Sequence, residues 1–320
     1  LSLQITPHRE TDANAQSVLE DFRAVAGGTE EPISDYTYLA TRIISRHARE
    51  AGYKVMLSGM GGDELFAGYP RHMAASRWRA LRGLRMPISL LARFLRHTEA
   101  WSKRADRLRS FIDSETFASA YASLIGYFSV SEVSRLLGSS VGVEKFLLRL
   151  EQLRAPVRNC SPLRQAMYLD RFGFLAHNLT VTDRASMAES IEVRVPLLTP
   201  DIEAFALSIP EHQITRRTSG KLPLRRYLMS RLSHQLIARP KAGFNPPLDG
   251  RIRLLGRDLC SELLTSGQLT GLLDSVLIRK LLAEHFDGRR NHTYRIWQLL
   301  YLGFWLESHG HCGQSYTGRL

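Results

Sequence analysis

The chain has 320 residues, of which 44% are hydrophobic and 23% charged, and its formal net charge is +12. This length can bury a large core, in one large domain or two medium ones. No run of about 18 apolar residues is present, so the sequence predicts no membrane span. The cysteines are odd in number and far apart, which argues against a disulfide framework and favours a reducing, cytoplasmic location. They are Cys160, Cys260 and Cys312.

The first part of the chain predicts half of an α/β sheet. Residues 1–5 are strand-like. Residues 15–26 and 38–52 repeat apolar side chains with helical spacing, and each pattern ends at glycine. Residues 55–57 form an apolar run short enough for a buried strand. Strand, helix, helix and buried strand is half of a doubly wound sheet.

A glycine-rich turn and two carboxylates follow this apolar run, in the sequence SGMGGDEL at residues 58–65. Ligands of open α/β sheets bind just beyond the carboxyl ends of the strands. Glycines let backbone N–H groups approach phosphate oxygens, and a carboxylate such as Asp63 can hold Mg²⁺ together with those oxygens. The stretch therefore predicts a phosphate and metal site.

Two better-known glycine loops do not fit this stretch. A P-loop is excluded because no Gly-Lys-Ser/Thr follows the glycines. Gly59 and Gly61 have the spacing of a dinucleotide fingerprint, but Glu64 stands where the third glycine belongs. An acid there would repel a pyrophosphate unless a metal intervened, which favours a metal-bridged nucleotide over NAD. The alternative is a tight strand-to-helix turn with no ligand.

The next stretch is the most basic part of the chain. Residues 77–97 interleave arginines with leucine, tryptophan and phenylalanine at helical spacing. Such a helix could bind nucleic acid or a membrane surface, but we favour a packing helix with a solvated basic face. No RNP, zinc-finger or helix-turn-helix signature is present, so we expect no nucleic-acid partner.

The remainder of the chain is mainly helical in pattern. Helical spacing runs from residue 77 to 158, with breaks near Pro87, Asp113 and Gly138, and again from residue 162 to 178. Strand signals nearly vanish after the first part. A loop with three prolines is predicted at residues 238–253, and helix follows to the end.

A second dense stretch, LTVTDRASMAESIEVRVPLL, occupies residues 179–198. Asp183-Arg184 and Glu192-Arg194 place alternating charges in a semi-apolar context. They either form a buried ion network that positions a loop, or they present arginine to a carboxylate substrate. Further on, Lys221 follows a Ser-Gly turn and precedes a helix. A lysine there can reach phosphates as a point charge, or it can be an ordinary solvated side chain.

Four motifs together resemble the synthetase domain of glutamine-hydrolysing asparagine synthetases. SGMGGDELFAGY at residues 58–69 is similar to that family's S-G-x-G-x-D-E-x-F-x-G-Y. DRASMAESIEVRVPLL at residues 183–198 is similar to its D-R-x-S-M-x-x-x-x-E-x-R-x-P-x-L. GKLPLR (220–225) and RPKAGFNPPL (239–248) resemble K-x-x-L-R and R-x-K-x-G-F-x-x-P. The motifs occur in the family's order and anchor the chain from about residue 30 to 250.

The resemblance implies an α/β fold. This fold is an adenine-nucleotide α-hydrolase-like parallel sheet, here partial, with a large, mostly helical C-terminal part. Residues 1–320 would be the C-terminal portion of one synthetase domain. Residues 1–75 would be the remaining sheet part, residues 76–160 a helical region and residues 161–320 the helical part with further motifs. The family's pyrophosphate loop, S-G-G-x-D-S, and its N-terminal glutaminase domain are absent, so we expect the chain alone to be inactive.

The resemblance also implies a reaction. An aspartate side-chain carboxylate attacks the α-phosphate of ATP, giving β-aspartyl-AMP and pyrophosphate, and ammonia then attacks the acyl-adenylate. The implied cofactors are ATP and Mg²⁺. The implied partners are aspartate, ammonia derived from glutamine and the glutaminase domain of the same parent chain. A homodimer is a further alternative.

Site residues follow only where the motifs match. Ser58, Gly59 and Gly61 would lie against the nucleotide, Asp63 would be a Mg²⁺ ligand near the pyrophosphate, and Lys221 would neutralise charge on the phosphates. Glu64 and the four charged residues of the second stretch would belong to the substrate site or to a structural ion network. They are Asp183, Arg184, Glu192 and Arg194.

Met60 departs from the family pattern, which has Glu, or Asp in many relatives, at this catalytic position. A thioether neither carries charge nor transfers a proton. The protein could therefore act on another carboxylate, as the related β-lactam synthetases and lasso-peptide cyclases do. A third hypothesis is a non-catalytic basic binding protein that kept the fold.

Overall fold

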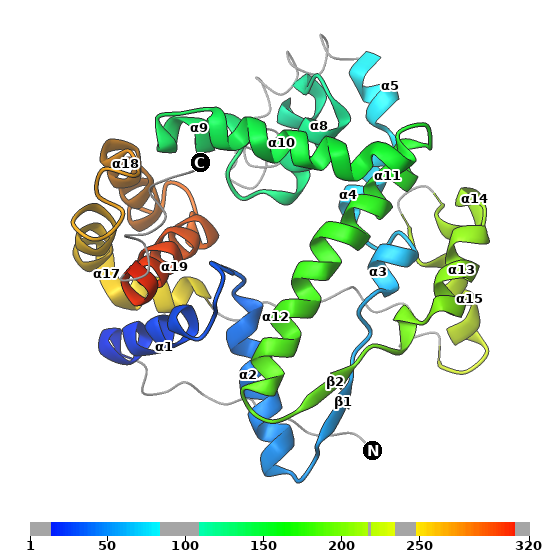
Figure 1. Ribbon diagram of the computed structural model, residues 1–320, viewed down its shortest axis with the longest axis horizontal. Coiled ribbons are helices and arrows are strands. Elements are labelled where there is room, and N and C mark those ends of the chain that lie inside the picture. The colour runs from blue at the N-terminus through cyan, green and yellow to red at the C-terminus, as the bar shows by residue number, and fades with distance from the viewer. Residues whose placement is uncertain (1–13, 84–108, 217–218, 234–247, 311–320) are drawn as a thin grey trace. The chain divides into compact units, whose positions relative to one another are not determined.

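The computed structural model describes residues 14–83, 109–216, 219–233 and 248–310 (Figure 1). The chain divides into two compact units, one from residues 1–36 and 245–320 and the other from residues 37–244. The predicted strand at residues 1–5, most of the basic stretch at residues 77–97, the motif at residues 239–247 and Cys312 lie outside the described residues.

The described part of the unit that joins the two chain ends is helical. Its helices are α1 (Ala15–Gly27), α17 (Leu248–Thr265), α18 (Ser275–Phe286) and α19 (Thr293–His309). Helix α1 buries one face, which carries Val18, Leu19, Phe22, Val25 and Ala26. This is the helical spacing that predicts an amphipathic helix, and the prediction for residues 15–26 is confirmed.

Aromatic packing holds α1 against α19. The Phe22 and Trp297 rings meet edge to face with centroids 4.6 Å apart. The Trp297 indole N–H donates to the Ser34 carbonyl at 2.7 Å, so this buried ring satisfies its polar atom. An ion pair of 2.9 Å between Arg251 Nη1 and Asp21 ties α17 to α1.

The predicted loop at residues 238–253 is wrong in its last part, because α17 begins at Leu248. Pro246 and Pro247 stand immediately before this helix, and proline is compatible with helix starts because the first N–H groups have no intrahelical partner.

The second unit contains two short strands among many helices. The strands are β1 (Val55–Leu57) and β2 (Glu192–Arg194). The helices before residue 160 are α2 (Thr37–Glu50), α3 (Gly62–Leu65), α4 (Pro70–Ser76), α5 (Trp78–Gly83), α8 (Phe117–Ile125), α9 (Val130–Leu137), α10 (Val141–Arg154) and η1 (Ala155–Val157). Those after it are α11 (Pro162–Leu169), η2 (Asp170–Leu175), α12 (Ala176–Met187), η3 (Pro196–Leu198), α13 (Pro200–Ser208), α14 (Glu211–Ile214) and α15 (Leu222–Met229).

The two strands pair in parallel, with Met56 opposite Val193. The chain is thus α/β with a small parallel sheet in a mostly helical setting, as predicted in outline. Strand β2 was not predicted, because a three-residue segment with charge at both ends has no apolar strand signature. Strand β1 is not buried as predicted: Val55 is 43% and Leu57 74% exposed. Both point to one face, which the described residues leave uncovered.

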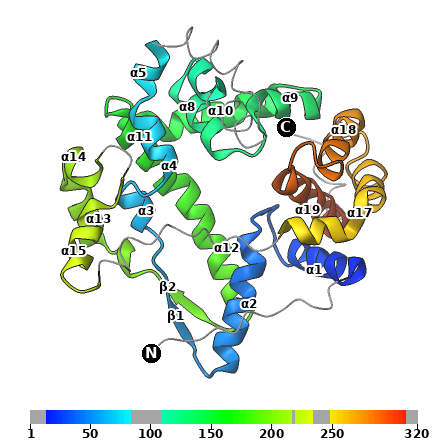
Figure 2. The ribbon, with the colours of Figure 1, turned by 180° about the vertical axis from the view of Figure 1, so that it is seen from behind.

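A continuous helical rod, residues 162–187, crosses this unit and appears in green in Figures 1 and 2. It consists of α11, the π-helix η2 and α12. Helix α2 packs alongside α12, and α4 packs on α11. The helix thus continues to residue 187, beyond the helical pattern predicted for residues 162–178, and it carries Asp183 and Arg184.

The segment after the glycine turn lies in a hydrophobic core of this unit. Leu65, Phe66 and Ala67 pack there with residues from α4, α11, α13 and α14. The end of β1 is consequently held from behind by a dense core, which fixes the position of the turn. None of the described helices is both long and apolar enough to cross a bilayer.

Candidate active site

The glycine turn begins where the two strands stop pairing. The Ser58 N–H donates to the Arg194 carbonyl at 2.8 Å, which extends the ladder by one residue. Gly61 has φ of 87°, and a Cβ at this position would overlap the Leu198 side chain. Only glycine combines this left-handed backbone with such a close approach. The second motif, through η3, therefore shapes the turn of the first.

Met60 lies between the turn and α12. Its N–H donates to Ser58 Oγ at 3.3 Å, and its sulfur accepts from Thr182 Oγ1 at 3.5 Å. The thioether thus contacts the residue that precedes Asp183. This places the side chain that departs from the family pattern beside the start of the DRASM motif.

Asp63 and Lys221 form an ion pair, with Nζ 2.9 Å from Oδ1. The two residues come from motifs far apart in the sequence, and the fold brings them together. Their side chains are 18% and 30% exposed, so the pair is reachable from solvent without being fully hydrated. A cation and a hard-oxygen ligand at one place suit a phosphate and its counterion.

The backbone around this pair is tight and strained. Lys221 has φ of 59°, in the left-handed region, and its N–H donates to the Phe66 carbonyl at 2.8 Å. A Cβ at Gly68 would overlap Asp63 and Lys221, and one at Gly220 would overlap the Ala67 carbonyl. A non-glycine residue in this region costs of order 1–3 kcal/mol, and such residues cluster at functional sites.

Glu64 is buried beside a layer of aromatic and arginine side chains. It accepts a hydrogen bond of 2.6 Å from the Tyr69 hydroxyl. Burial, together with the Glu64 carboxylate, raises the pKa of Tyr69 well above its usual value. The Arg71 guanidinium lies 3.7 Å from the Tyr69 ring centroid and 4.2 Å from that of Phe174. Arg71 is thus held between two rings.

A buried carboxylate, Asp170, completes this layer. It accepts from Arg71 Nε at 2.8 and 3.0 Å, from His72 Nε2 at 2.5 Å and from the Tyr121 hydroxyl at 2.5 Å. Burial alone would raise the pKa of Asp170, but the His72 hydrogen bond and the charges of His72 and Arg71 outweigh it and lower this pKa. We call Tyr69, Arg71, His72, Tyr121 and Asp170 the Asp170 network.

Sequence reasoning missed the Asp170 network. Two signals could have indicated it. The tripeptide Pro70-Arg71-His72 follows the first motif directly, and Asp170 is a lone acid in the aromatic stretch MYLDRFGFL. Asp170 also begins the π-helix η2, and π-helical turns are frequent at functional sites.

The charges of the second motif do not form one buried network, so that interpretation is wrong. Glu192 and Arg194 pair with each other at 3.1 Å, but their side chains are 56% and 64% exposed because they lie on the uncovered strand β2. Asp183 is exposed on α12, and Arg184 is half-buried.

The buried acid of this region is Glu189, which sequence reasoning did not single out. It accepts from Arg42 Nε at 2.7 Å and from Arg46 Nη2 at 2.9 Å, which ties the turn after α12 to α2. Hydrogen bonds from Arg46 and Arg42 lower the pKa of Glu189 to about 2. Glu189 therefore stays ionised at any physiological pH.

No cluster of three or more His, Cys, Asp or Glu side chains able to hold a metal occurs in the described part of the chain. Of the cysteines, Cys160 is exposed and Cys260 is buried, and burial raises the pKa of Cys260 to about 12.

The model of a sequence family described as asparagine synthase matches residues 3–307. Proteins of Mycobacterium bovis and Mycobacterium tuberculosis, provisionally named glutamine-hydrolysing asparagine synthetases, are 28% identical over 286 residues, covering 86% of this chain and 42% of theirs. Glutamine-hydrolysing asparagine synthetase 1 of Bacillus subtilis is 22% identical over 279 residues, covering 86% of this chain and 44% of its own. The chain thus spans less than half the length of these relatives. No solved structure is significantly similar to it.

Proposed function

Because the chain belongs to the asparagine synthase family, we propose that it is part of an enzyme that forms amides by ATP-dependent activation of a carboxylate. The observation that carries this proposal is the ion pair of Asp63 with Lys221 beside the glycine turn. This pair joins two of the family motifs, and it supplies a cation and a carboxylate, which are the charges that phosphate chemistry requires.

In the first step the substrate carboxylate oxygen attacks the α-phosphorus of ATP. The bond from that phosphorus to the bridging oxygen breaks, and the electron pair leaves with pyrophosphate. Lys221 is the fixed cation that stabilises this charge, held by Asp63 and by its own constrained backbone. A preorganised charge needs no reorganisation during the reaction, and removing one such group typically costs about 2.7–4 kcal/mol.

Asp63 fits a Mg²⁺ ligand by its chemistry. Mg²⁺ is usually held by one or two carboxylates together with substrate phosphates, so a single well-placed carboxylate is sufficient. The bound ion would neutralise the departing pyrophosphate. Lys221 pairs with Asp63 at 2.9 Å, which places its ammonium beside the site proposed for the phosphates.

The turn itself would cradle the nucleotide. Ser58, Gly59 and Gly61 follow the carboxyl end of β1, where ligands of parallel sheets bind. Gly59 has open space around it, since no atom lies within 4 Å of a Cβ built there, so a ligand can approach its backbone. Tyr69 and Glu64 lie behind the turn and position it from the core side.

In the second step ammonia attacks the acyl carbon, and AMP leaves as the carbon–oxygen bond breaks. We propose glutamine as the ammonia source, through a glutaminase domain, because the named relatives are glutamine-hydrolysing. We also propose that the chain is a portion of a longer synthetase, since it covers 42–44% of those relatives. We propose a cytoplasmic location for this protein.

A second candidate is the same chemistry on a carboxylate other than aspartate. Met60 favours it, because a thioether bound to Thr182 stands where the family has an acid. An apolar, polarisable side chain offers no proton acceptor to an amine and suits a less polar substrate.

The test is ATP–pyrophosphate exchange by the complete protein, with aspartate and with a panel of other carboxylates. Aspartate-dependent exchange supports asparagine formation. Exchange that depends on another carboxylate instead supports the second candidate. No exchange with any carboxylate, in a protein that is folded, would contradict both and leave a non-catalytic protein with this fold.

A further inference from the structure

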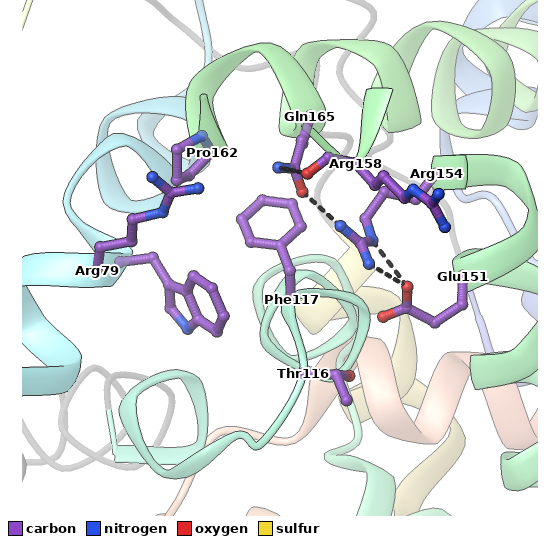
Figure 3. A pocket seen from close by; sticks show the side chains of 9 residues that line it. Arg79, Thr116, Phe117, Glu151, Arg154, Arg158, Pro162 and Gln165 are labelled. Atoms are coloured by element: carbon purple, nitrogen blue, oxygen red, sulfur yellow. Dashed lines mark hydrogen bonds and ion pairs between the residues drawn. The ribbon is translucent and has the colours of Figure 1, made fainter. Parts of the chain in front are cut away.

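A cavity of about 400 Å³ lies in the second unit, apart from the glycine turn. Helices α5, α8, α10 and α11 surround it (Figure 3). Its volume falls within the range of small-ligand pockets, about 300–1,000 Å³. Three arginines and one glutamate line it, so the lining carries two positive charges in excess. They are Arg79, Arg154, Arg158 and Glu151.

One of the arginines is a fixed part of the wall. Arg154 donates to Glu151 Oε2 from Nε at 2.8 Å and from Nη2 at 2.5 Å, and to Gln165 Oε1 from Nη1 at 2.9 Å. Glu151 therefore neutralises Arg154 and no other cation of the lining. Figure 3 shows this chain of contacts along one side of the cavity.

The other two arginines carry the excess charge. Arg79 and Arg158 are both exposed, and within the part of the chain that the structure describes neither guanidinium has an ion-pair partner. In the view of Figure 3 they lie on opposite sides of Phe117. Two guanidinium groups on either side of one cavity match a dianion better than a monoanion, because a carboxylate satisfies one arginine fork.

Buried Gln165 fixes the segment that carries Arg158. Its Nε2 donates to the Arg158 carbonyl at 3.0 Å and to the Cys160 carbonyl at 2.8 Å. Only 3% of Gln165 is exposed, so these contacts are sheltered from water. The backbone that carries Arg158 is thus fixed in the helical frame, so that only the exposed arginine side chains must be ordered when a ligand binds.

The floor of the cavity is aromatic. Trp78 and Phe117 line it and meet edge to face, with ring centroids 5.3 Å apart. Aromatic faces and proline provide flat apolar area for a ring of the ligand, while the guanidiniums bind its charge. Phosphomonoesters are close to dianionic at neutral pH, since their second pKa is about 6.

From this combination we propose that the cavity binds a small phosphomonoester attached to a flat aromatic ring. The cavity shares no lining residue with the Asp63–Lys221 site. The proposal is therefore independent of the proposed function, and its test can fail or succeed without it.

The test is isothermal titration of the full chain with phenyl phosphate at pH 7.5, with inorganic phosphate and phenol as the two halves of the probe. We expect one phenyl phosphate per chain, bound at least tenfold more tightly than inorganic phosphate or phenol. The double variant Arg79→Gln with Arg158→Gln should weaken phenyl phosphate at least tenfold. Equal affinity for phenyl phosphate and inorganic phosphate would contradict the aromatic part of the proposal.

A matched control removes the same charge elsewhere. Arg135 and Arg149 are exposed on α9 and α10, so Arg135→Gln with Arg149→Gln should leave binding unchanged. If both double variants weakened phenyl phosphate binding equally, the ligand would be attracted by overall charge and the proposed site would be wrong. The proposal would also be wrong if the unaltered chain did not bind phenyl phosphate. Lys221→Ala should bind phenyl phosphate normally; loss of binding there would place the ligand in the Asp63–Lys221 site and also overturn this proposal.

Discussion

The Asp63–Lys221 pair and the Asp170 network lie in one unit and are built in opposite ways. The pair is partly exposed, one carboxylate with one cation, and is held by a backbone in a strained conformation. Asp170 is fully buried, and its two oxygens accept four hydrogen bonds from three side chains. The charges of Asp63 and Lys221 can therefore exchange partners with a substrate, whereas the charges around Asp170 hold the fold in place.

The largest expected effect is on stability, from Asp170→Asn. The amide leaves the buried Arg71 charge without its counterion, and breaking a buried pair in this way typically costs 3–5 kcal/mol. We expect the free energy of unfolding, from urea denaturation, to fall by about that amount. Asp183→Asn, on the exposed face of α12, is the control and should change it by less than about 0.5 kcal/mol. If both substitutions lowered the free energy of unfolding equally, Asp170 would not have the special structural role proposed for it.

Lys221 should show the reverse behaviour, with activity lost and the fold kept. Lys221→Ala removes the cation beside the phosphates, so ATP–pyrophosphate exchange by the complete protein should fall by about 10²–10³-fold. Lys221→Gly should be equally inactive but more stable than Lys221→Ala by about 1 kcal/mol, because glycine tolerates the left-handed backbone. Arg149→Gln, on the exposed face of α10, is the control for lost charge and should leave exchange unchanged. Retained exchange in Lys221→Ala would contradict the proposed role.

Gly61→Ala should affect both stability and nucleotide binding. The new Cβ meets Leu198 and must adopt φ of 87°, so we expect a loss of about 1–3 kcal/mol in unfolding free energy and a higher KM for ATP. Adding Leu198→Ala removes the overlap but not the backbone strain. The double variant should therefore reverse only part of the rise in KM, and a full return to the original KM would show that the left-handed backbone is unimportant.

The smallest expected effect concerns acid and Glu189. Its pKa falls from about 4.3 in the unfolded chain to about 2 in the folded one. Its contribution to stability is therefore complete above about pH 5 and is lost as pH falls toward 2. Because Arg46 is half-exposed, we expect this contribution to be on the order of 1 kcal/mol.

Glu189→Gln should flatten the stability curve between about pH 5 and 2, measured by denaturation at a series of pH values. Glu192→Gln, whose side chain is 56% exposed, is the control and should leave the curve unchanged. A curve of unchanged slope in Glu189→Gln would show that other carboxylates govern the acid limb.

The sequence predicts the part of the site that depends on local pattern. Gly61, Asp63 and Lys221 stand in motifs whose residue types match phosphate chemistry, and the fold places the last two in contact. Helices α1 and α2 were predictable because their apolar spacing repeats over three turns or more.

The parts that escaped prediction depend on tertiary burial. Nothing next to Asp170 indicates that His72 and Tyr121, 98 and 49 residues away, will surround it. Strand β2 is three residues long, which is too short for alternation to appear. The exposure of Leu57 contradicts its apolar character, because hydrophobicity predicts a preference for burial but not which neighbours provide it.

The π-helix η2 sets how far α12 is rotated about the helix axis relative to α11. Its wider turn accommodates roughly one extra residue, and each residue turns an α-helix by about 100°. Side chains of α12 are therefore rotated relative to those of α11 by an amount that the wide turn sets. Removing one residue from η2 would leave α11 and α12 helical but would turn Thr182 away from Met60. The π-helical turn therefore sets the contact between the glycine-turn motif and the motif on α12.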